Sequence, residues 1–165
     1  MSLGTVLDHL LPLARALRND KVSEDGGDPS LLFNTIVEAG YLVAAADGTV
    51  DAHELTTLKR AVLVLTEDDV SVSELDELVA DFVDLRKTLG EDDRCRVVGR
   101  VLQSHHAAEE GLSLAAAIAY ASNGLDANEL KVLEKIAVHA GQSIASVAAI
   151  ASQVRDELSR RSIPG

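Results

Sequence analysis

Two acidic segments of the chain have the residue types and spacing to bind a cation. The first reads DGTVDAHE from Asp47 to Glu54, which matches the second half of a calcium-binding loop with Asp47, Asp51 and Glu54 at ligand positions. Val43 and Ala45 occupy the places of the first two ligands, and neither side chain has an oxygen, so a complete EF-hand is excluded. A cation bound here would need further ligands from elsewhere in the chain. Hard oxygen ligands favour Ca²⁺ or Mg²⁺ over zinc.

The second acidic segment repeats the first further along the chain. Residues 44–58 read AAADGTVDAHELTTL and residues 119–133 read AYASNGLDANELKVL, with seven of the fifteen aligned positions identical. Gly48 aligns with Asn123, and both residue types tolerate the left-handed conformation that closes a helix. Ser122 replaces Asp47, so the second copy has one carboxylate fewer. Each copy predicts a helix, a tight turn and a helix, and together they predict an internal pseudo-two-fold repeat.

The same acidic residues also fit a purely structural role. The spacings Asp51-x-x-Glu54 and Asp126-x-x-Glu129 are typical of capping boxes, in which the Asp and Glu side chains bind the first backbone N–H groups of a helix. Each cap contributes about 1 kcal/mol to stability. Capping and cation binding are compatible, because a carboxylate has about four acceptor sites and a cap uses one or two.

Other reactive residue types lack the pattern of a catalytic site. His105 and His106 stand four residues before Glu109 and Glu110, but a di-iron bundle needs two Glu-x-x-His motifs and the chain has none. Charge complementation at a helix end explains these histidines more simply. Cys95 has no accompanying base, which indicates a packing thiol. Neither a phosphate-binding glycine loop nor a nucleophile elbow is present, so we expect no enzyme.

Helical periodicity extends over almost the whole chain. Apolar residues recur at i, i+3, i+4 and i+7, and no segment alternates as a strand would. The predicted helices cover residues 3–17, 29–46, 51–65, 71–90 (with Ser71 or Ser73 as the start), 91–110, 113–121, 126–140 and 143–160. We expect Gly90, Gly111 and Gly141 to follow helix ends. The polar, glycine-rich residues 19–28 predict a mobile loop. The expected fold is all-α, a bundle of seven to eight short helices forming a single domain over residues 1–165.

Composition narrows the classes of function. The chain has 165 residues, 27 of them acidic and 15 basic, and its net charge of −12 disfavours binding to nucleic acid or to an anionic membrane surface. Its single cysteine excludes an intrachain disulfide and a cysteine-based zinc cluster. The apolar runs are too short to insert into a membrane, and no export signal begins the sequence. We therefore expect a cytoplasmic protein.

The first acidic segment, in its helical setting, resembles the TerB family of tellurite-resistance proteins. The resemblance depends on the pattern Ala-Asp-Gly-x-Val-Asp-x-x-Glu-x-x-x-Leu from Ala46 to Leu58, repeated once, and it extends over residues 31–140. The same module accompanies some membrane-anchored J-domain co-chaperones. The family is all-helical, and the resemblance implies that its acidic turn residues form a divalent-cation site. In this sequence those residues are Asp47, Asp51, Glu54, Asp126 and Glu129.

The resemblance implies a non-enzymatic module that acts in a stress response through other proteins, membrane-associated stress proteins among them. A Ca²⁺ or Mg²⁺ ion would relieve the repulsion among the converging carboxylates and tie the two hairpins together. The alternative is a metal-free interaction scaffold, or a co-chaperone-type module, whose acidic turns are only helix caps. An enzyme with a carboxylate–metal site for hydrolysis is a third hypothesis, which no pocket signature in the sequence supports.

Overall fold

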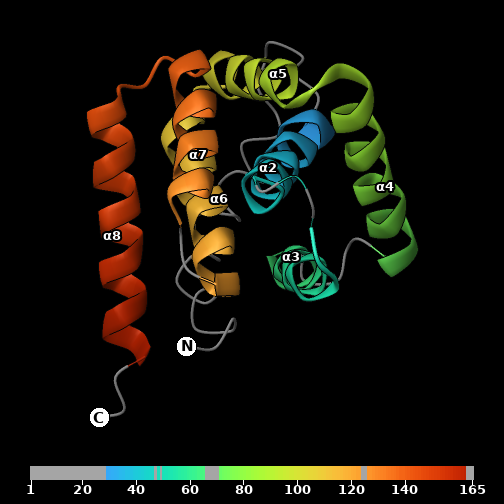
Figure 1. Ribbon diagram of the computed structural model, residues 1–165, viewed down its shortest axis with the longest axis horizontal. Coiled ribbons are helices and arrows are strands. Elements are labelled where there is room, and N and C mark those ends of the chain that lie inside the picture. Colours follow the sequence, from blue (N-terminus) through green and yellow to red (C-terminus); the bar gives the residue numbers. More distant parts are fainter. Residues whose placement is uncertain (1–28, 47, 49, 66–70, 124–125, 163–165) are drawn as a thin grey trace.

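The computed structural model describes residues 29–46, 48, 50–65, 71–123 and 126–162, apart from the side chains of 29–33, 54, 61–62, 64–65, 110, 118, 121–123 and 157–162. These residues form seven helices and no strand, which confirms the all-α class (Figure 1). The helices are α2 Pro29–Ala44, α3 Ala52–Leu65, α4 Val72–Leu89, α5 Glu91–Ser104, α6 Ala108–Asn123, α7 Ala127–His139 and α8 Ile144–Ser162. The helix expected over 3–17 and the loop expected over 19–28 lie outside the described residues.

Helix α2 is the centre of the bundle. Every residue from Thr35 to Ala45 is buried, and α2 packs against α3, α4, α5, α6 and α7. A helix that is apolar on all sides gains stability by being covered on all sides, which explains why this segment lies at the centre. Glu38 is the charged exception, with 4% of the residue exposed, and burying its charge requires a partner.

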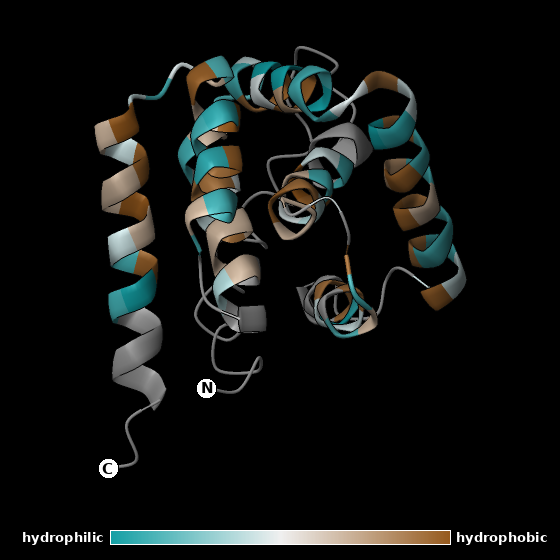
Figure 2. Cartoon of the chain, viewed as in Figure 1, coloured by the Kyte–Doolittle hydropathy of each residue, from teal (hydrophilic) through white to brown (hydrophobic). Residues whose placement is uncertain are grey.

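The other helices surround α2. Helix α5 crosses one end of the bundle, α4 stands on one side, and α8 packs on the opposite side against α6 and α7 (Figure 1). Hydrophilic and hydrophobic residues alternate around α4 and α7, as expected for helices with one buried face (Figure 2). Tyr41 of α2 packs on Phe82 of α4, with ring centroids 6.0 Å apart. None of the described helices has the length and apolar character needed to cross a membrane.

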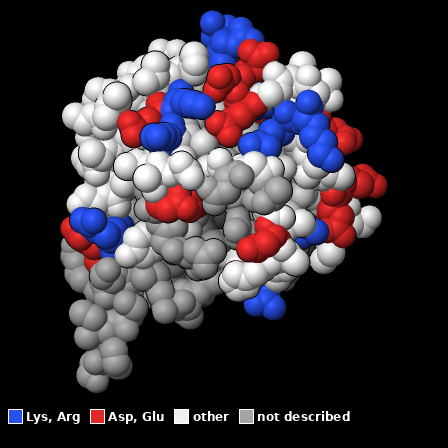
Figure 3. Space-filling model, in the orientation of Figure 1, with Lys and Arg blue, Asp and Glu red and all other residues white. Residues whose placement is uncertain are grey.

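The outer face of α4 is acidic. Glu74, Glu77, Asp81 and Asp84 are all exposed there. Asp76, on the same helix, forms an ion pair of 2.7 Å with Lys59 of α3. Acidic side chains gather along this edge of the molecule, whereas acidic and basic groups are mixed over the end formed by α5 (Figure 3). Among the described residues on this face, acidic side chains are therefore concentrated along α4.

The boundary between α5 and α6 differs from the sequence-based prediction. We expected a helix over 91–110 that ends before Gly111, but α5 ends at Ser104 and Gly111 lies within α6. The helical conformation is interrupted at His106, which has a left-handed φ of +53°. The N–H of the next residue, Ala107, donates to the Leu102 carbonyl. Gly111 packs against Leu102 of α5, where an added Cβ would lie 2.6 Å from the terminal methyl carbon Cδ2 of that side chain.

A second glycine lets two helices approach closely. Gly99 of α5 faces α7, where a Cβ added to Gly99 would lie 2.5 Å from His139 Cβ and 2.6 Å from the Ile136 carbonyl oxygen. Real Cβ atoms do not approach backbone atoms this closely. The close contact between α5 and α7 therefore requires glycine at position 99, because glycine has no Cβ. The predicted pseudo-two-fold relation between the two sequence repeats stays a prediction.

Candidate functional site

The first acidic segment forms the connection between α2 and α3. Gly48 is exposed with φ of +95°, and its N–H donates to the Ala45 carbonyl over 2.9 Å, which closes the end of α2. Asp51 is exposed directly before α3, and its carbonyl accepts the Leu55 N–H over 3.0 Å. Asp47 and the side chain of Glu54 lie outside the described residues. Asp51 is therefore exposed to solvent at the N-terminal end of α3.

The second acidic segment begins α7 with the predicted capping box. Asp126 is the N-cap, and its Oδ1 accepts the Glu129 N–H over 2.8 Å. In return Glu129 Oε1 accepts the Asp126 N–H over 3.4 Å. The structural role expected for Asp126 and Glu129 is thus confirmed. The carboxylate oxygens that form the box are Asp126 Oδ1 and Glu129 Oε1.

The five predicted ligands are described only in part. Among the described residues, no group of three or more His, Cys, Asp or Glu side chains could hold a metal ion. Because Asp47 and the Glu54 side chain are outside that set, a site shared by both turns stays a prediction. The donor chemistry fits a hard cation, since each proposed ligand offers carboxylate oxygens of the kind that Ca²⁺ and Mg²⁺ prefer.

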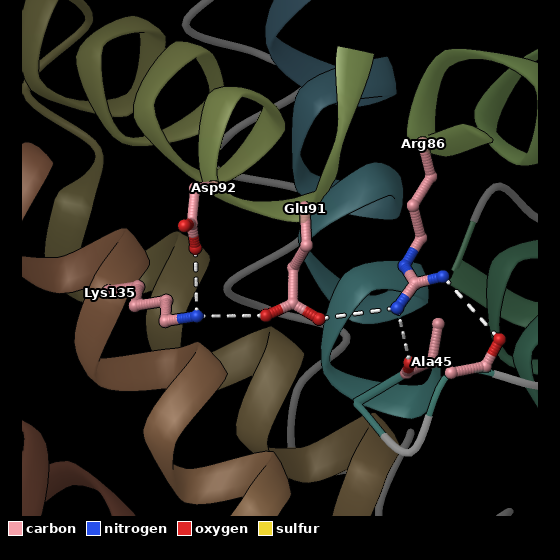
Figure 4. A network of polar contacts seen from close by, with 6 residues as sticks. Ala45, Arg86, Glu91, Asp92 and Lys135 are labelled. Atoms are coloured by element: carbon pink, nitrogen blue, oxygen red, sulfur yellow. Dashed lines mark hydrogen bonds and ion pairs between the residues drawn. The ribbon is translucent and has the colours of Figure 1, made fainter. Parts of the chain in front are cut away.

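Arg86 anchors the α2–α3 turn, although no pattern in the sequence indicates this role. From the last turn of α4 its Nη2 donates to the Ala45 carbonyl over 3.0 Å, and its Nη1 lies 3.5 Å from the Gly48 carbonyl oxygen (Figure 4). The same Nη2 lies 3.3 Å from Glu91 Oε2 at the start of α5. The Arg86 side chain is only 19% exposed, so water competes weakly for these contacts. One guanidinium therefore joins the ends of α2 and α4 to the start of α5.

Glu91 extends this set of contacts to α7. Its Oε1 accepts from Lys135 Nζ over 3.0 Å, and Lys135 also donates to Asp92 over 2.8 Å (Figure 4). These bonds raise the pKa of Lys135 and lower the pKa of Asp92, because each partner stabilises the charged form of the other. We call Arg86, Glu91, Asp92 and Lys135 the polar network; its two positive and two negative charges cancel.

A buried ion pair joins α2 to α5 beside this network. Arg94 donates from Nε and Nη2 to the two carboxylate oxygens of Glu38, with both distances 2.7 Å. The side chains are 12% and 6% exposed, and the pairing raises the pKa of Arg94. The sequence contained one signal for it, since Glu38 is the single charge in the apolar run from Ile36 to Ala46.

The remaining reactive residues have structural surroundings. Burial raises the pKa of the Cys95 thiol to about 12, so the thiol stays protonated and unreactive near neutral pH. This confirms the packing role expected for Cys95. His105 Nδ1 lies 2.9 Å from the Val101 carbonyl oxygen, which ties its ring to the end of α5. Neither feature indicates catalytic chemistry.

Comparison with known proteins identifies the family of this helical bundle. The sequence model of the family described as tellurite resistance protein TerB matches residues 34–152, from within α2 to within α8 and well over half of the chain. No match was found among curated proteins or among solved structures. The matched region includes both acidic segments, the polar network and the buried ion pair. On this evidence, the chain belongs to the TerB family.

Proposed function

We propose that this chain is a non-enzymatic module that binds a divalent cation at its acidic turns and acts through other proteins in a cytoplasmic stress response of the tellurite-resistance type. Its partners include membrane-associated stress proteins. The cation is Ca²⁺ or Mg²⁺, and it ties together the hairpins of the two sequence repeats. The proposed ligands are Asp47, Asp51, Glu54, Asp126 and Glu129.

The exposed position of Asp51 carries this proposal. Asp51 stands in the open turn that precedes α3, where a hydrated cation can reach it without passing through the core. Carboxylates gathered at two helix N-termini repel one another, and a divalent cation relieves that repulsion when it binds. TerB family membership supports the association with tellurite resistance.

The capping box on α7 favours a second candidate function. Asp126 and Glu129 already satisfy backbone N–H groups of their own helix. If Asp51 and Glu54 do the same on α3, the acidic turns need no ion, and the chain is a metal-free scaffold or co-chaperone-type module. In that case replacing Asp47 changes stability little, because its position corresponds to no cap in either hairpin.

Thermal unfolding separates the two functions. The full chain is stripped with EDTA and then melted with Ca²⁺, Mg²⁺, Mn²⁺ or Zn²⁺. An ion at about 100 times its Kd stabilises by roughly 2.7 kcal/mol, which raises the Tm by about 5–10 °C for a chain of this size. The test variant is Asp47→Ala, and its control is Asp81→Ala, which removes the same charge from the exposed face of α4.

The cation site predicts a Tm shift that is largest for Ca²⁺ or Mg²⁺, absent in Asp47→Ala and retained in Asp81→Ala. The absence of a shift with every ion overturns the cation site and leaves the scaffold. A shift that both variants lose equally reflects general charge neutralisation, and this result also overturns the site.

A further inference from the structure

A single residue, Gly90, connects helix α4 to helix α5. It has φ of +90° and ψ of 157°, a backbone conformation that is essentially limited to glycine. Among the described residues beyond its chain neighbours, no heavy atom lies within 4 Å of the place where a Cβ would stand. A one-glycine connection with open space around it is flexible, so other contacts must fix the angle between the two helices.

Few apolar side chains hold α4 on the bundle. Three of its 18 residues are buried, whereas α5 buries four of 14 and α7 buries four of 13. The contacts of α4 with the hydrophobic core come from Leu75, Val79 and Phe82, with the partly buried Leu78 and Val83 beside them. The acidic outer face of α4 contributes no burial. Apolar packing therefore fixes α4 less firmly than it fixes α5 and α7.

Polar contacts of Arg86 supply a second attachment. From the last turn of α4, Arg86 donates to the Ala45 carbonyl at the end of α2 over 3.0 Å. It also forms an ion pair of 3.3 Å with Glu91, which lies on the other side of Gly90 (Figure 4). Lys135 of α7 in turn holds Glu91 over 3.0 Å. Arg86 thus bridges the one-residue connection and fixes α4 against α2 and α5.

A further ion pair of α4 is weaker. Lys59 of α3 lies 2.7 Å from Asp76 of α4, and the two side chains are 29% and 53% exposed. Ion pairs at such exposed positions contribute about 1 kcal/mol or less. The Arg86 side chain is 19% exposed, so water competes less with its contacts. Arg86 is therefore the stronger of these two polar attachments.

We propose that α4 is a hinged cover over the central helix α2, which swings about Gly90 and is held closed by Arg86. Hinges are commonly a few residues at the ends of elements, where the backbone angles can change. When the cover opens, Phe82 leaves Tyr41, and apolar surface of α2 that is buried in the closed form becomes accessible. This inference is independent of cation binding, because none of these residues is a proposed ligand.

Native-state hydrogen exchange of the full chain, at low urea concentrations, tests the cover. We expect the amides of α4 to exchange through an opening that leaves α5 and α7 protected. Arg86→Gln should speed the exchange of α4 about tenfold or more, the effect of losing a hydrogen bond to a charged group. Arg86→Lys should recover part of the protection, because an ammonium can pair with Glu91 but lacks the planar fork of arginine.

Three other variants test the hinge and control for general stability. Gly90→Ala forces alanine into a glycine conformation, and a swing about this residue releases the strain, so α4 should again exchange faster. Arg94→Lys disturbs the buried pair between α2 and α5, which stays closed when α4 opens. It should speed exchange in α5 and leave exchange in α4 unchanged. Arg100→Gln, at an exposed position on α5, should change neither.

Four results would overturn the cover. If the wild-type α4 amides exchange with the same free energy of opening as those of α5 and α7, α4 separates only in global unfolding. Unchanged α4 exchange in Arg86→Gln shows that Arg86 does not hold the helix closed. Equal acceleration of α4 by Arg94→Lys shows general destabilisation. Unchanged α4 exchange in Gly90→Ala, with faster exchange in α5, shows that Gly90 is not the hinge.

Discussion

Arg94 of α5 and Glu38 of α2 meet inside the bundle through two parallel hydrogen bonds of 2.7 Å. Breaking such a buried pair from one side leaves the other charge without compensation. We expect Arg94→Met to lower the free energy of unfolding by about 3 kcal/mol. Urea denaturation at neutral pH measures the loss, and the exposed control Arg100→Met should change it by less than about 0.5 kcal/mol.

The double variant Glu38→Met/Arg94→Met gives the complementary result. Replacing both partners with apolar side chains removes the uncompensated charge, and such replacements are often neutral or stabilising. The double variant should therefore be more stable than Arg94→Met. If its loss of stability equals the sum of the two single losses, the side chains do not interact as the structure places them.

The Cys95 thiol should make stability depend on alkaline pH. Burial raises its pKa from 9.0 to about 12, so between these values the unfolded chain releases a proton that the folded chain retains. Below the pKa of the thiol in the unfolded chain, this group does not change the free energy of unfolding. Above that pKa, the free energy of unfolding falls by about 1.4 kcal/mol per pH unit. The stability difference between wild type and Cys95→Ala should shift in favour of the variant from pH 9 to 11. A constant difference, measured by urea unfolding, would contradict the buried thiol.

Gly99 should tolerate no larger residue. Gly99→Ala places a Cβ against the backbone of α7, and the overpacking should cost about 1–3 kcal/mol. Gly111→Ala is the matched control, because its Cβ meets only the flexible end of Leu102, and alanine favours the interior of α6 by about 1 kcal/mol. Thermal melts should therefore show the larger loss for Gly99→Ala, and the reverse order would refute the close approach.

Asp126 should stabilise α7 through its cap whether or not an ion binds. Asp126→Ala removes the acceptor for the Glu129 N–H and should cost about 1 kcal/mol in EDTA. Asp126→Ser keeps an N-cap acceptor and should retain most of that stability. Chemical denaturation of both variants tests the cap. Equal losses in the free energy of unfolding would show that the negative charge of Asp126, rather than its N-cap hydrogen bond, stabilises α7.

The sequence predicted local features well, because local signals determine them. Ser71, one of the two serines at which α4 was expected to begin, caps this helix. Gly90 follows α4 with φ of +90°, and Asp126 caps α7, as the residue types indicated. The predicted α5–α6 boundary was wrong because apolar periodicity continued through the break, and Gly111, which lies within α6, was interpreted as the residue that follows a helix end. His106 gave no comparable sign of its left-handed conformation.

Contacts between distant segments could not be predicted in the same way. Arg86 binds Ala45, and Arg94 binds Glu38 across 56 residues, yet no spacing rule links either pair. A buried Glu38 required a positively charged side chain as its partner, but the sequence has several basic residues that could form this pair. These choices depend on how the helices pack, so the anchor of the acidic turn emerged only from the fold.

The packing of Tyr41 on Phe82 supplies an optical signal. The chain has two tyrosines and no tryptophan, and Tyr41 is buried while Tyr120 is half-buried. Burial also raises the Tyr41 pKa, so the tyrosinate absorbance of this ring should appear at a higher pH than that of an exposed phenol. Ultraviolet absorbance and tyrosine emission can therefore follow the separation of α2 from α4 without an attached dye.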